Sequence, residues 1–291
     1  MKKILIQLDT DKHPSTFDRI VAYDAGVDEV LSYGGITPSD VRGLVLSAVF
    51  TRGIPDLKTI AVWIGGFNVT LGEQVLAEVQ RSFFGPFRVS VMLDSNGCNT
   101  TAATAIAKLV KTYDLKGKKA VVIGLGPVGL RSAMLLQQEG CSVTVTSIPP
   151  ELLGARYNPD IARQSLEMAR QVPNLTVEDV PDRTALERCL EGAEIAIAAG
   201  PAGVQLLRYD FWSKHPTLRW LVDFNLTEPL GIEGIKASDD LTERDGKIVL
   251  GPLAIGNPKM KVHKACVAKL FERNDLVLNI EGVYAVARET V

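Results

Sequence analysis

The sequence predicts an α/β protein made of two α/β domains, each with a parallel sheet, and a cleft between them. Its 291 residues exceed the ~100–200 residues typical of one domain. Strand-like and helix-like segments alternate along the first third of the chain, and a second alternating series follows residue 118. Such alternation is typical of parallel sheets covered by helices on both faces.

Four apolar runs in the first third are predicted strands. They cover residues 4–8, 29–33, 59–64 and 87–93. Helices are predicted to begin near Ser15, at Pro38, which suits a first helical turn, and at Thr70. Glycine or a short polar side chain ends each strand. Since ligands bind beyond the carboxyl ends of parallel strands, this edge is predicted to bind a substrate, with Asp94 and Asn96 among its residues. Tight turns need the same residue types, and that is the alternative.

The stretch "DSNGCNTTAA" (94–103) opens a helix with more polar side chains than a cap requires. One short polar side chain suffices to accept from the free N–H groups of a helix start, and Asn99, Thr100 and Thr101 supply three. The surplus amide and hydroxyl groups are therefore predicted to face the substrate.

The turn "GLGPVG" (124–129) matches the G-x-G-x-x-G fingerprint of dinucleotide-binding domains. It lies between an apolar strand and an amphipathic helix, and a second strand follows. Gly124 permits the tight turn, Gly126 lets the backbone reach a pyrophosphate, and Gly129 allows close helix–strand packing. Pro127 and Val128 start the helix, whose free N–H groups suit an anion. A glycine-rich turn without a nucleotide is the alternative, and the strand–helix–strand context argues against it.

Further predicted strands complete this second, Rossmann-type sheet. They cover residues 119–123, 142–147, 175–180, 194–199, 218–224 and 247–250. No long low-complexity linker separates the two halves, and the boundary is placed near residues 114–117. Residues 115–249 are predicted to form the NAD(P)-binding domain, and residues 1–114, completed by 250–291, the substrate domain.

The second strand of the Rossmann unit ends without the acid that usually holds the ribose 2′-hydroxyl of NAD. Ser147 stands there instead, and a hydroxyl group can donate to a 2′-phosphate. Arg156, beyond a proline-containing loop, is a candidate to reach that phosphate, and Glu151 would hold the ribose if the loop folds back. NADP is therefore favoured, with NAD left open. Gly200, in the run "AIAAGPAG", suits either a flat ring over the sheet edge or a helix-start turn.

Lysines cluster near the start of the last predicted helix, in "GNPKMKVHKAC" (256–266). Cations at a helix N-terminus oppose the helix dipole, and Lys261 and Lys264 are interpreted as solvated. Lys259 follows "GNP" in a predicted loop. It is the candidate cation that orients an anionic or carbonyl-bearing substrate, or stabilises charge during reaction. His263 is interpreted as a helix-surface residue in preference to a functional one.

Asp18 supports two interpretations. The stretch "STFD" (15–18) resembles a capping box with aspartate in place of glutamate, in which the carboxylate bonds the Ser15 backbone. The same residue lies beside the predicted crevice, where a carboxylate would bond amide N–H groups of a ligand. The sequence leaves both interpretations open.

The composition argues against several other classes of protein. The net charge is −2 and no basic patch occurs, which argues against nucleic-acid binding. The four cysteines form no C-x-x-C pair and indicate reduced thiols in the cytoplasm. The three histidines show no metal-ligand spacing, so no metal is predicted, and H-E-x-x-H and G-x-S-x-G are absent. No run approaches the ~18 apolar residues that span a bilayer, so no membrane contact is expected.

Several stretches together resemble the NADP-dependent methylene-tetrahydromethanopterin / methylene-tetrahydrofolate dehydrogenases of methylotrophic bacteria. They are "LDTDKHPSTFD", "FFGPFRVSVMLDSNGCNTTAA", "GLGPVGLRSA", "DFNLTEPLGIEGI" and "GNPKMKVHKACVAKLFE". The resemblance covers nearly the whole chain. The second and last of these stretches are far more specific than the glycine fingerprint.

The resemblance implies two α/β domains with a cleft, a homo-oligomer, and direct hydride transfer to NADP from a one-carbon unit carried by a reduced pterin. By position, Lys259 matches the family's active-site lysine, Thr101 a threonine lining the pterin pocket, and Asp18 a carboxylate on the same wall. The product cation is shared by two nitrogens, so orientation and exclusion of water replace a general base. NADP-dependent members tend to carry an arginine directly after the second strand, where this chain has "SIPPE", and this departure leaves NAD possible.

Two alternative functions predict features that this sequence lacks or does not need. A bifunctional methylene-tetrahydrofolate dehydrogenase/cyclohydrolase would carry a Tyr-x-x-x-Lys helix, and Tyr23, Tyr33, Tyr113 and Tyr157 all lack lysine at that spacing. A non-enzymatic nucleotide-binding redox sensor would keep the glycine fingerprint but has no use for a polar crevice in the first domain. Tetrahydromethanopterin and tetrahydrofolate present a similar reduced pterin, so the substrate prediction covers both carriers.

Overall fold

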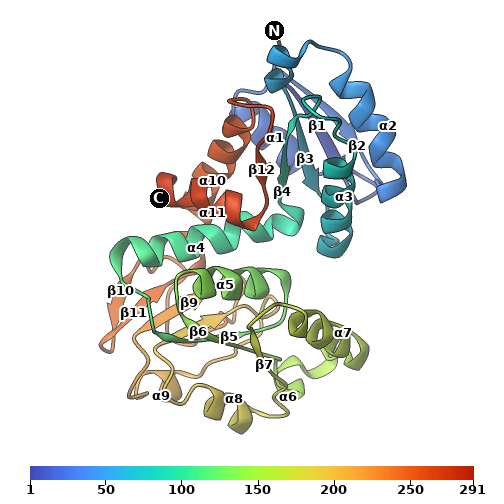
Figure 1. Cartoon of the computed structure of the whole chain (residues 1–291). Helices are drawn as coiled ribbons and strands as arrows, with labels where there is room; N and C mark the ends of the chain where they lie inside the picture. Colours follow the sequence, from blue (N-terminus) through green and yellow to red (C-terminus); the bar gives the residue numbers. More distant parts are fainter. The chain divides into compact units, whose positions relative to one another are not determined.

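The computed structural model describes residues 1–291 and divides into two compact units, each with its own sheet (Figure 1). Unit 1 comprises Met1–Thr100 and Lys259–Val291, and unit 2 comprises Thr101–Pro258. The chain passes between the units inside two helices, α4 (Cys98–Thr112) and α10 (Pro252–Lys269). The predicted α/β class with two parallel-sheet units is confirmed.

Unit 1 contains a five-stranded parallel sheet in the order β12-β4-β3-β1-β2. The strands are β1 (Ile4–Asp9), β2 (Glu29–Tyr33), β3 (Ile60–Gly65), β4 (Ser90–Leu93) and β12 (Val277–Leu278). All six residues of β3 are buried, because helices cover both faces of the sheet. The four strands predicted in this region are confirmed, and β12 was missed because two residues show no period.

The helices of unit 1 follow the predicted alternation. They are α1 (Thr16–Asp24), α2 (Pro38–Val49), α3 (Val69–Arg81) and α11 (Ile280–Thr290), with 3₁₀ turns η1 (Ile54–Thr59) and η2 (Ser95–Gly97). Figure 1 shows α2 and α3 on one face of the sheet and α1 and α10 on the other. The core beneath α2 and α3 includes Leu8, Val62 and Ile64 from the sheet and Val45 and Val75 from the helices.

Unit 2 contains a seven-stranded sheet in the order β10-β11-β9-β8-β5-β6-β7. The strands are β5 (Lys119–Ile123), β6 (Ser142–Thr146), β7 (Thr176–Glu178), β8 (Ile195–Ala198), β9 (Trp220–Asp223), β10 (Thr242–Arg244) and β11 (Lys247–Leu250). The run from β7 to β11 is parallel and has the strand order of a Rossmann fold, which confirms that prediction. The short polar edge strand β10, antiparallel to β11, was missed.

The helices of unit 2 lie on both faces of its sheet, with α5 on one face and α8 and α9 on the other (Figure 1). They are α5 (Pro127–Gln138), α6 (Pro150–Leu153), α7 (Pro159–Arg170), α8 (Arg183–Cys189) and α9 (Tyr209–Trp212), with a 3₁₀ turn η3 (Gly154–Arg156). No helix in either unit combines the length and the apolar character needed to cross a bilayer.

The last long helix differs from the prediction. α10 begins at Pro252, so the "GNP" segment lies inside the helix, with Pro258 as an interior proline. The predicted loop before Lys259 was therefore wrong, and the lysines do not stand at a helix N-terminus. Glycine and proline are helix-ending signals in sequence, but an interior proline costs a helix only one N–H and local crowding, which packing can offset.

We expect the interior strand β1 of unit 1 to tolerate truncation poorly. Leu8 in β1 is fully buried, so Leu8→Ala should lower the free energy of unfolding by about 2–5 kcal/mol through lost burial and a residual cavity. Leu31 in the neighbouring β2 is 42% exposed, and Leu31→Ala should cost under about 1 kcal/mol. Urea titration of both variants measures the difference, and equal losses would contradict this account of the core.

Candidate active site

A polar cavity of about 270 Å³ lies in unit 1, where β1, β3 and β4 end. It is lined by Asp11, Ser15, Phe17, Asp18, Gly66, Phe67, Asp94, Asn96, Gly97, Lys259 and His263. Because the strands are parallel, their carboxyl ends bring these separate turns together, with α1 and α10 adding side chains. Four of the residues predicted from sequence, Asp18, Asp94, Asn96 and Lys259, meet here.

Carboxylates and glycines shape the turns around the cavity. The Asp9 carboxylate accepts hydrogen bonds from the backbone N–H groups of Asp11 and Ser15, both at 2.8 Å. The Asp11 carboxylate accepts from the Phe67 N–H at 3.1 Å. Gly66 has φ +94°, and a Cβ there would collide with the Thr10 hydroxyl, so this turn requires glycine.

The polar residues that open α4 support Asp94 from inside the protein. The Asp94 carboxylate accepts from the Thr100 N–H at 3.0 Å and from the Thr100 hydroxyl at 2.7 Å. The Asn99 amide donates to the Leu93 carbonyl at 2.7 Å. Asn99 and Thr100 are buried, so the prediction that they face the substrate was wrong. The Asn99 side chain thus satisfies a carbonyl at the end of β4, and the Asp94 carboxylate satisfies an N–H in the first turn of α4.

Thr101 does not line the cavity. It lies one position beyond Thr100 on α4 and is the first residue of unit 2. Its predicted contact with the pterin therefore stays a prediction that rests on the family resemblance.

Lys259 reaches the cavity from the middle of α10. Its Nζ lies 5.5 Å from the centre of the Phe17 ring, a cation–π contact. A Cβ at Gly97 would lie only 2.8 Å from the same Nζ, so glycine leaves room for the amine. No carboxylate oxygen lies within ion-pair distance of this ammonium group, which leaves it available to a ligand.

The Asp18 carboxyl group lines the cavity and does not complete a capping box. The Ser15 hydroxyl accepts from the Asp18 N–H at 3.2 Å, but the Ser15 N–H donates to Asp9. Burial raises the pKa of Asp18 to about 7, and the negative charges of Asp94 and Asp9 add to the effect, whereas the Lys259 ammonium opposes it. The predicted bond from the Ser15 N–H to the Asp18 carboxylate is therefore absent, and that part of the capping-box interpretation is wrong. The position of Asp18 in the cavity lining agrees with the crevice interpretation.

His263 is buried in the wall of the cavity, so the prediction of a surface histidine was wrong. Its ring lies 4.8 Å from the Trp63 ring, and its Nε2 is 3.5 Å from the Asp94 carboxylate. Neither ring nitrogen has a hydrogen-bond partner. Burial lowers the pKa of His263 to about 4, so the imidazole is neutral. His263 lies four residues after Lys259, a spacing that puts both side chains on one face of a helix. The sequence could not show this, because a loop was predicted before Lys259.

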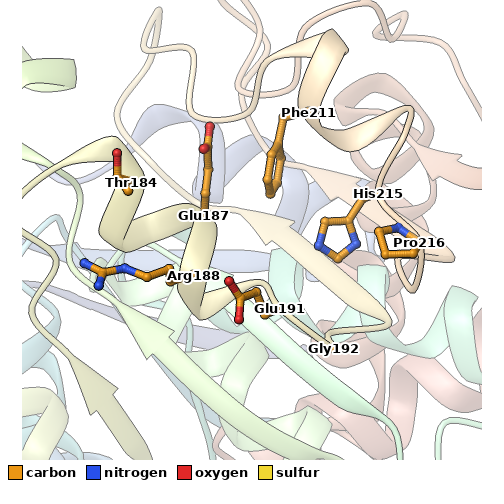
Figure 2. Close-up of a pocket in the computed structure, with 8 residues that line it drawn as sticks. All are labelled: Thr184, Glu187, Arg188, Glu191, Gly192, Phe211, His215 and Pro216. Atoms are coloured by element: carbon orange, nitrogen blue, oxygen red, sulfur yellow. The ribbon is translucent and has the colours of Figure 1, made fainter.

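Unit 2 holds a larger cavity, of about 480 Å³, between α8 and α9. Figure 2 shows Phe211, His215 and Pro216 beside the acidic pair Glu187 and Glu191. The residues that precede β8 and β9 line it, so it opens at the amino ends of the strands. Dinucleotides bind at the carboxyl ends of such sheets, which excludes this cavity as the predicted cofactor site.

The glycine-rich turn of unit 2 has the geometry of a dinucleotide site. Gly124 has φ +121°, and a Cβ there would lie 2.5 Å from the Ala199 carbonyl oxygen. A Cβ at Gly129 would collide with the Gly124 carbonyl, which keeps α5 close to the strand end. No atom lies within 4 Å of the Cβ position of Gly126. Space therefore opens over the start of α5, where Pro127 has no N–H and the N–H of Val128 lacks a helical partner and suits an anion.

The hydroxyl group of Ser147, directly after the second strand of the Rossmann unit, already has hydrogen-bond partners within the protein. The Ser147 hydroxyl donates to the Asp179 carboxylate and accepts from the Val180 N–H, both at 2.8 Å. The suggestion that Ser147 donates to a 2′-phosphate is therefore contradicted. The physical reason is β7, which lies beside β6 and brings these partners to the same edge.

Two other predicted cofactor residues lie at the strand-end edge of the same unit. The Arg156 guanidinium donates to the Ala202 carbonyl at 2.5 Å, and no carboxylate pairs with it. A Cβ at Gly200 would lie 3.0–3.1 Å from Leu206 and Ile148, so this turn is closely packed. The Glu151 carboxylate accepts from the Arg183 N–H at the start of α8, at 3.0 Å.

The two units together define a class of protein. A Rossmann sheet with an open glycine turn, and a second parallel sheet with a polar cavity at its strand ends, are the parts of an NAD(P)-dependent dehydrogenase. Residues 16–96 match the family of the methylene-tetrahydromethanopterin dehydrogenase N-terminal domain, and residues 112–205 match an NAD(P)-binding family.

Two curated relatives come from Methylorubrum extorquens. The bifunctional protein MdtA is 42% identical over 291 residues, covering 99% of both chains. The NAD(P)-dependent methylenetetrahydromethanopterin dehydrogenase is 29% identical over 299 residues, covering 99% of this chain and 98% of the other. The chain belongs to the methylene-tetrahydromethanopterin dehydrogenase family.

Solved structures with low sequence identity share the fold. The shikimate dehydrogenase of Aquifex aeolicus has a TM-score of 0.52 at 14% identity, with 99% of this chain and 97% of that one covered. A methylenetetrahydrofolate dehydrogenase/cyclohydrolase from Campylobacter jejuni has a TM-score of 0.50 at 14% identity, with 100% and 90% covered. These two likenesses concern the fold alone.

Two glycines of the fingerprint should respond differently to alanine. Gly129→Ala should lower the free energy of unfolding by about 1–3 kcal/mol and also weaken NADP binding, because its Cβ collides with backbone. Gly126→Ala should weaken NADP binding with little loss of stability, because its Cβ enters open space. Calorimetric binding and urea titration separate the two effects. Unchanged NADP affinity in both variants would remove the turn from the cofactor site.

The raised pKa of Asp18 predicts a pH-dependent stability. The folded protein holds this proton more tightly than the unfolded chain, so the resulting stability is full below about pH 4 and is lost as the pH rises to about 7. Asp18→Asn cannot lose this proton, so its free energy of unfolding should exceed that of the wild type by about 4 kcal/mol at pH 8, with little difference at pH 4. Urea titrations at both pH values test this, and a parallel decline in both proteins would refute it.

Proposed function

We propose that this chain oxidises N5,N10-methylene-tetrahydromethanopterin to its methenyl form with NADP as hydride acceptor. The observation that carries the proposal is the cavity in unit 1, which joins the Asp18 carboxyl and the unpaired Lys259 ammonium in a chain of this family. Methylene-tetrahydrofolate, which presents a similar reduced pterin, is the second expected substrate.

The cavity residues are suited to hold a flat heterocycle. Asp18 offers a carboxyl group to ring N–H and amino groups, and Asp94 and Asn96 form the floor beside it. Phe67 is 72% exposed while lining the cavity, so its ring is free to stack on a ligand. Lys259 adjusts the charge on the pterin side. Fixing the reacting carbon in this way lowers the barrier by orientation, without a proton-transfer residue.

Unit 2 supplies the nucleotide site in this proposal. The N–H groups at the start of α5, behind Gly124, Gly126 and Gly129, would hold the pyrophosphate. When bound, the nicotinamide accepts the hydride. With the Ser147 hydroxyl occupied, Arg156 is the remaining predicted partner of a 2′-phosphate, and this supports NADP while leaving NAD as a competitor. A homo-oligomer in the cytoplasm is part of the same proposal.

Lys259→Ala should lower the rate of NADPH formation at least ~100-fold, because the ammonium group that stabilises charge during the reaction is lost. NADP affinity should stay unchanged, since the nucleotide site lies in unit 2. Lys261→Ala is the matched control, because Lys261 is exposed on the same helix and should keep full activity. Reduced-nicotinamide absorbance measures the rate with each pterin carrier and each of NADP and NAD. A wild-type protein inactive with both carriers would end the proposal, and normal turnover by Lys259→Ala would remove the lysine from it.

A further inference from the structure

The cavity in unit 1 carries an excess of carboxyl groups. Asp9, Asp11, Asp18 and Asp94 lie in or directly behind its wall, against the single ammonium group of Lys259. The Asp18 Oδ2 and Asp9 Oδ2 atoms lie 3.0 and 3.5 Å from the Cβ position of Gly65, so these two carboxyls approach the same point. The neutral His263 adds no positive charge. Repulsion among these carboxyl groups favours the binding of one proton to the cluster while no ligand is present.

Three of these four carboxyls are satisfied by donors that stay in place. Asp9 accepts from two backbone N–H groups, Asp11 from the Phe67 N–H, and Asp94 from the N–H and hydroxyl of Thr100. Asp18 has no backbone donor, and its only hydrogen-bonding neighbour is Ser15. Asp18 is therefore the carboxyl group of this cluster whose oxygens are left for a proton or a ligand.

The proposed reaction moves positive charge into this cavity. The methylene carbon loses a hydride, with its electron pair, to the nicotinamide, which is reduced. The carrier becomes a methenyl cation whose charge is shared by two nitrogens. A cation placed beside a carboxyl group favours the ionised form of that group and lowers its pKa.

We propose that Asp18 holds a proton while the cavity is empty or contains the neutral methylene carrier, and releases it to solvent when the methenyl cation forms. The O–H bond of the carboxylic acid breaks, water takes the proton, and the carboxylate left behind faces the cation. Asp18 would thus hydrogen-bond the substrate as an acid and stabilise the product as an anion. The inference rests on the proposed function, and it adds one released proton to the products of the proposed reaction.

The proposal predicts a linkage between product binding and pH. In the wild type, the association constant of the methenyl carrier should rise up to ~10-fold per pH unit between about pH 5.5 and 7, then level off, because each bound cation displaces one proton. Binding of the methylene carrier should be flat over the same range. Calorimetry in two buffers of different ionisation enthalpy should show about one proton released per methenyl carrier bound at about pH 6, and close to none at about pH 8.

Asp18→Asn keeps the shape of the side chain and cannot ionise. It should bind the methenyl carrier with no pH slope and at least ~10-fold more weakly than the wild type at about pH 8, while methylene-carrier affinity changes less than ~3-fold. Asp18→Glu should restore a slope. Asp24→Asn is the control, because this carboxylate ends the same helix, pairs with Lys264 at 2.8 Å and should leave the slope unchanged.

The outcomes separate this inference from the proposed function. A wild type that turns over but binds the methenyl carrier without a pH slope would overturn the inference alone, as would an Asp18→Asn variant that keeps the slope. A wild type that neither binds nor oxidises the methylene carrier would overturn both. The proton count on the wild type needs no variant, so poor folding of Asp18→Asn would not prevent the test.

Discussion

The contacts of the Asp94 carboxylate hold together the elements that form the cavity of unit 1. It accepts from the N–H and the hydroxyl of Thr100, so it fixes the start of α4 against the end of β4. It also lies 3.5 Å from His263 on α10 and adds its charge to the field around Asp18. This buried carboxyl group thus links the end of β4 and the start of α4 to α10, which comes from a distant part of the sequence. A neutral side chain at this position would free the helix start and change the charge of the cavity together.

Unit 2 relies on a different constraint, the absence of side chains where backbone must meet backbone. Gly124 and Gly129 let the strand end, the helix start and the Ala199 carbonyl approach within distances that a Cβ would not allow. Gly126, by contrast, faces open space. The fingerprint therefore contains two kinds of glycine, one that permits packing and one that leaves room for a ligand. The cavity of unit 1 is lined by charged side chains, whereas the glycine turn of unit 2 exposes backbone groups.

The sequence predicted the parallel-strand framework and the Rossmann unit because apolar runs and glycine turns are local signals. It also placed Asp18 and Lys259 near the edge of the sheet where the cavity of unit 1 lies. It failed where a partner comes from a distant segment: Asn99 and Thr100 turn inward to β4, and Ser147 is held by Asp179 across a neighbouring strand. The short strands β10 and β12 carry no period of their own.

Unit 1 is discontinuous: its cavity lysine, its buried histidine and its edge strand β12 all belong to the last segment of the chain. Unit 2 is continuous and is complete when the ribosome has made Pro258. Until the final segment arrives, β4 presents an unpaired apolar edge, a template for association with other chains. Synthesis of unit 2 is thus finished before the β4 edge of unit 1 is covered by β12. A chain that terminates within the last two helices leaves this edge exposed to aggregation.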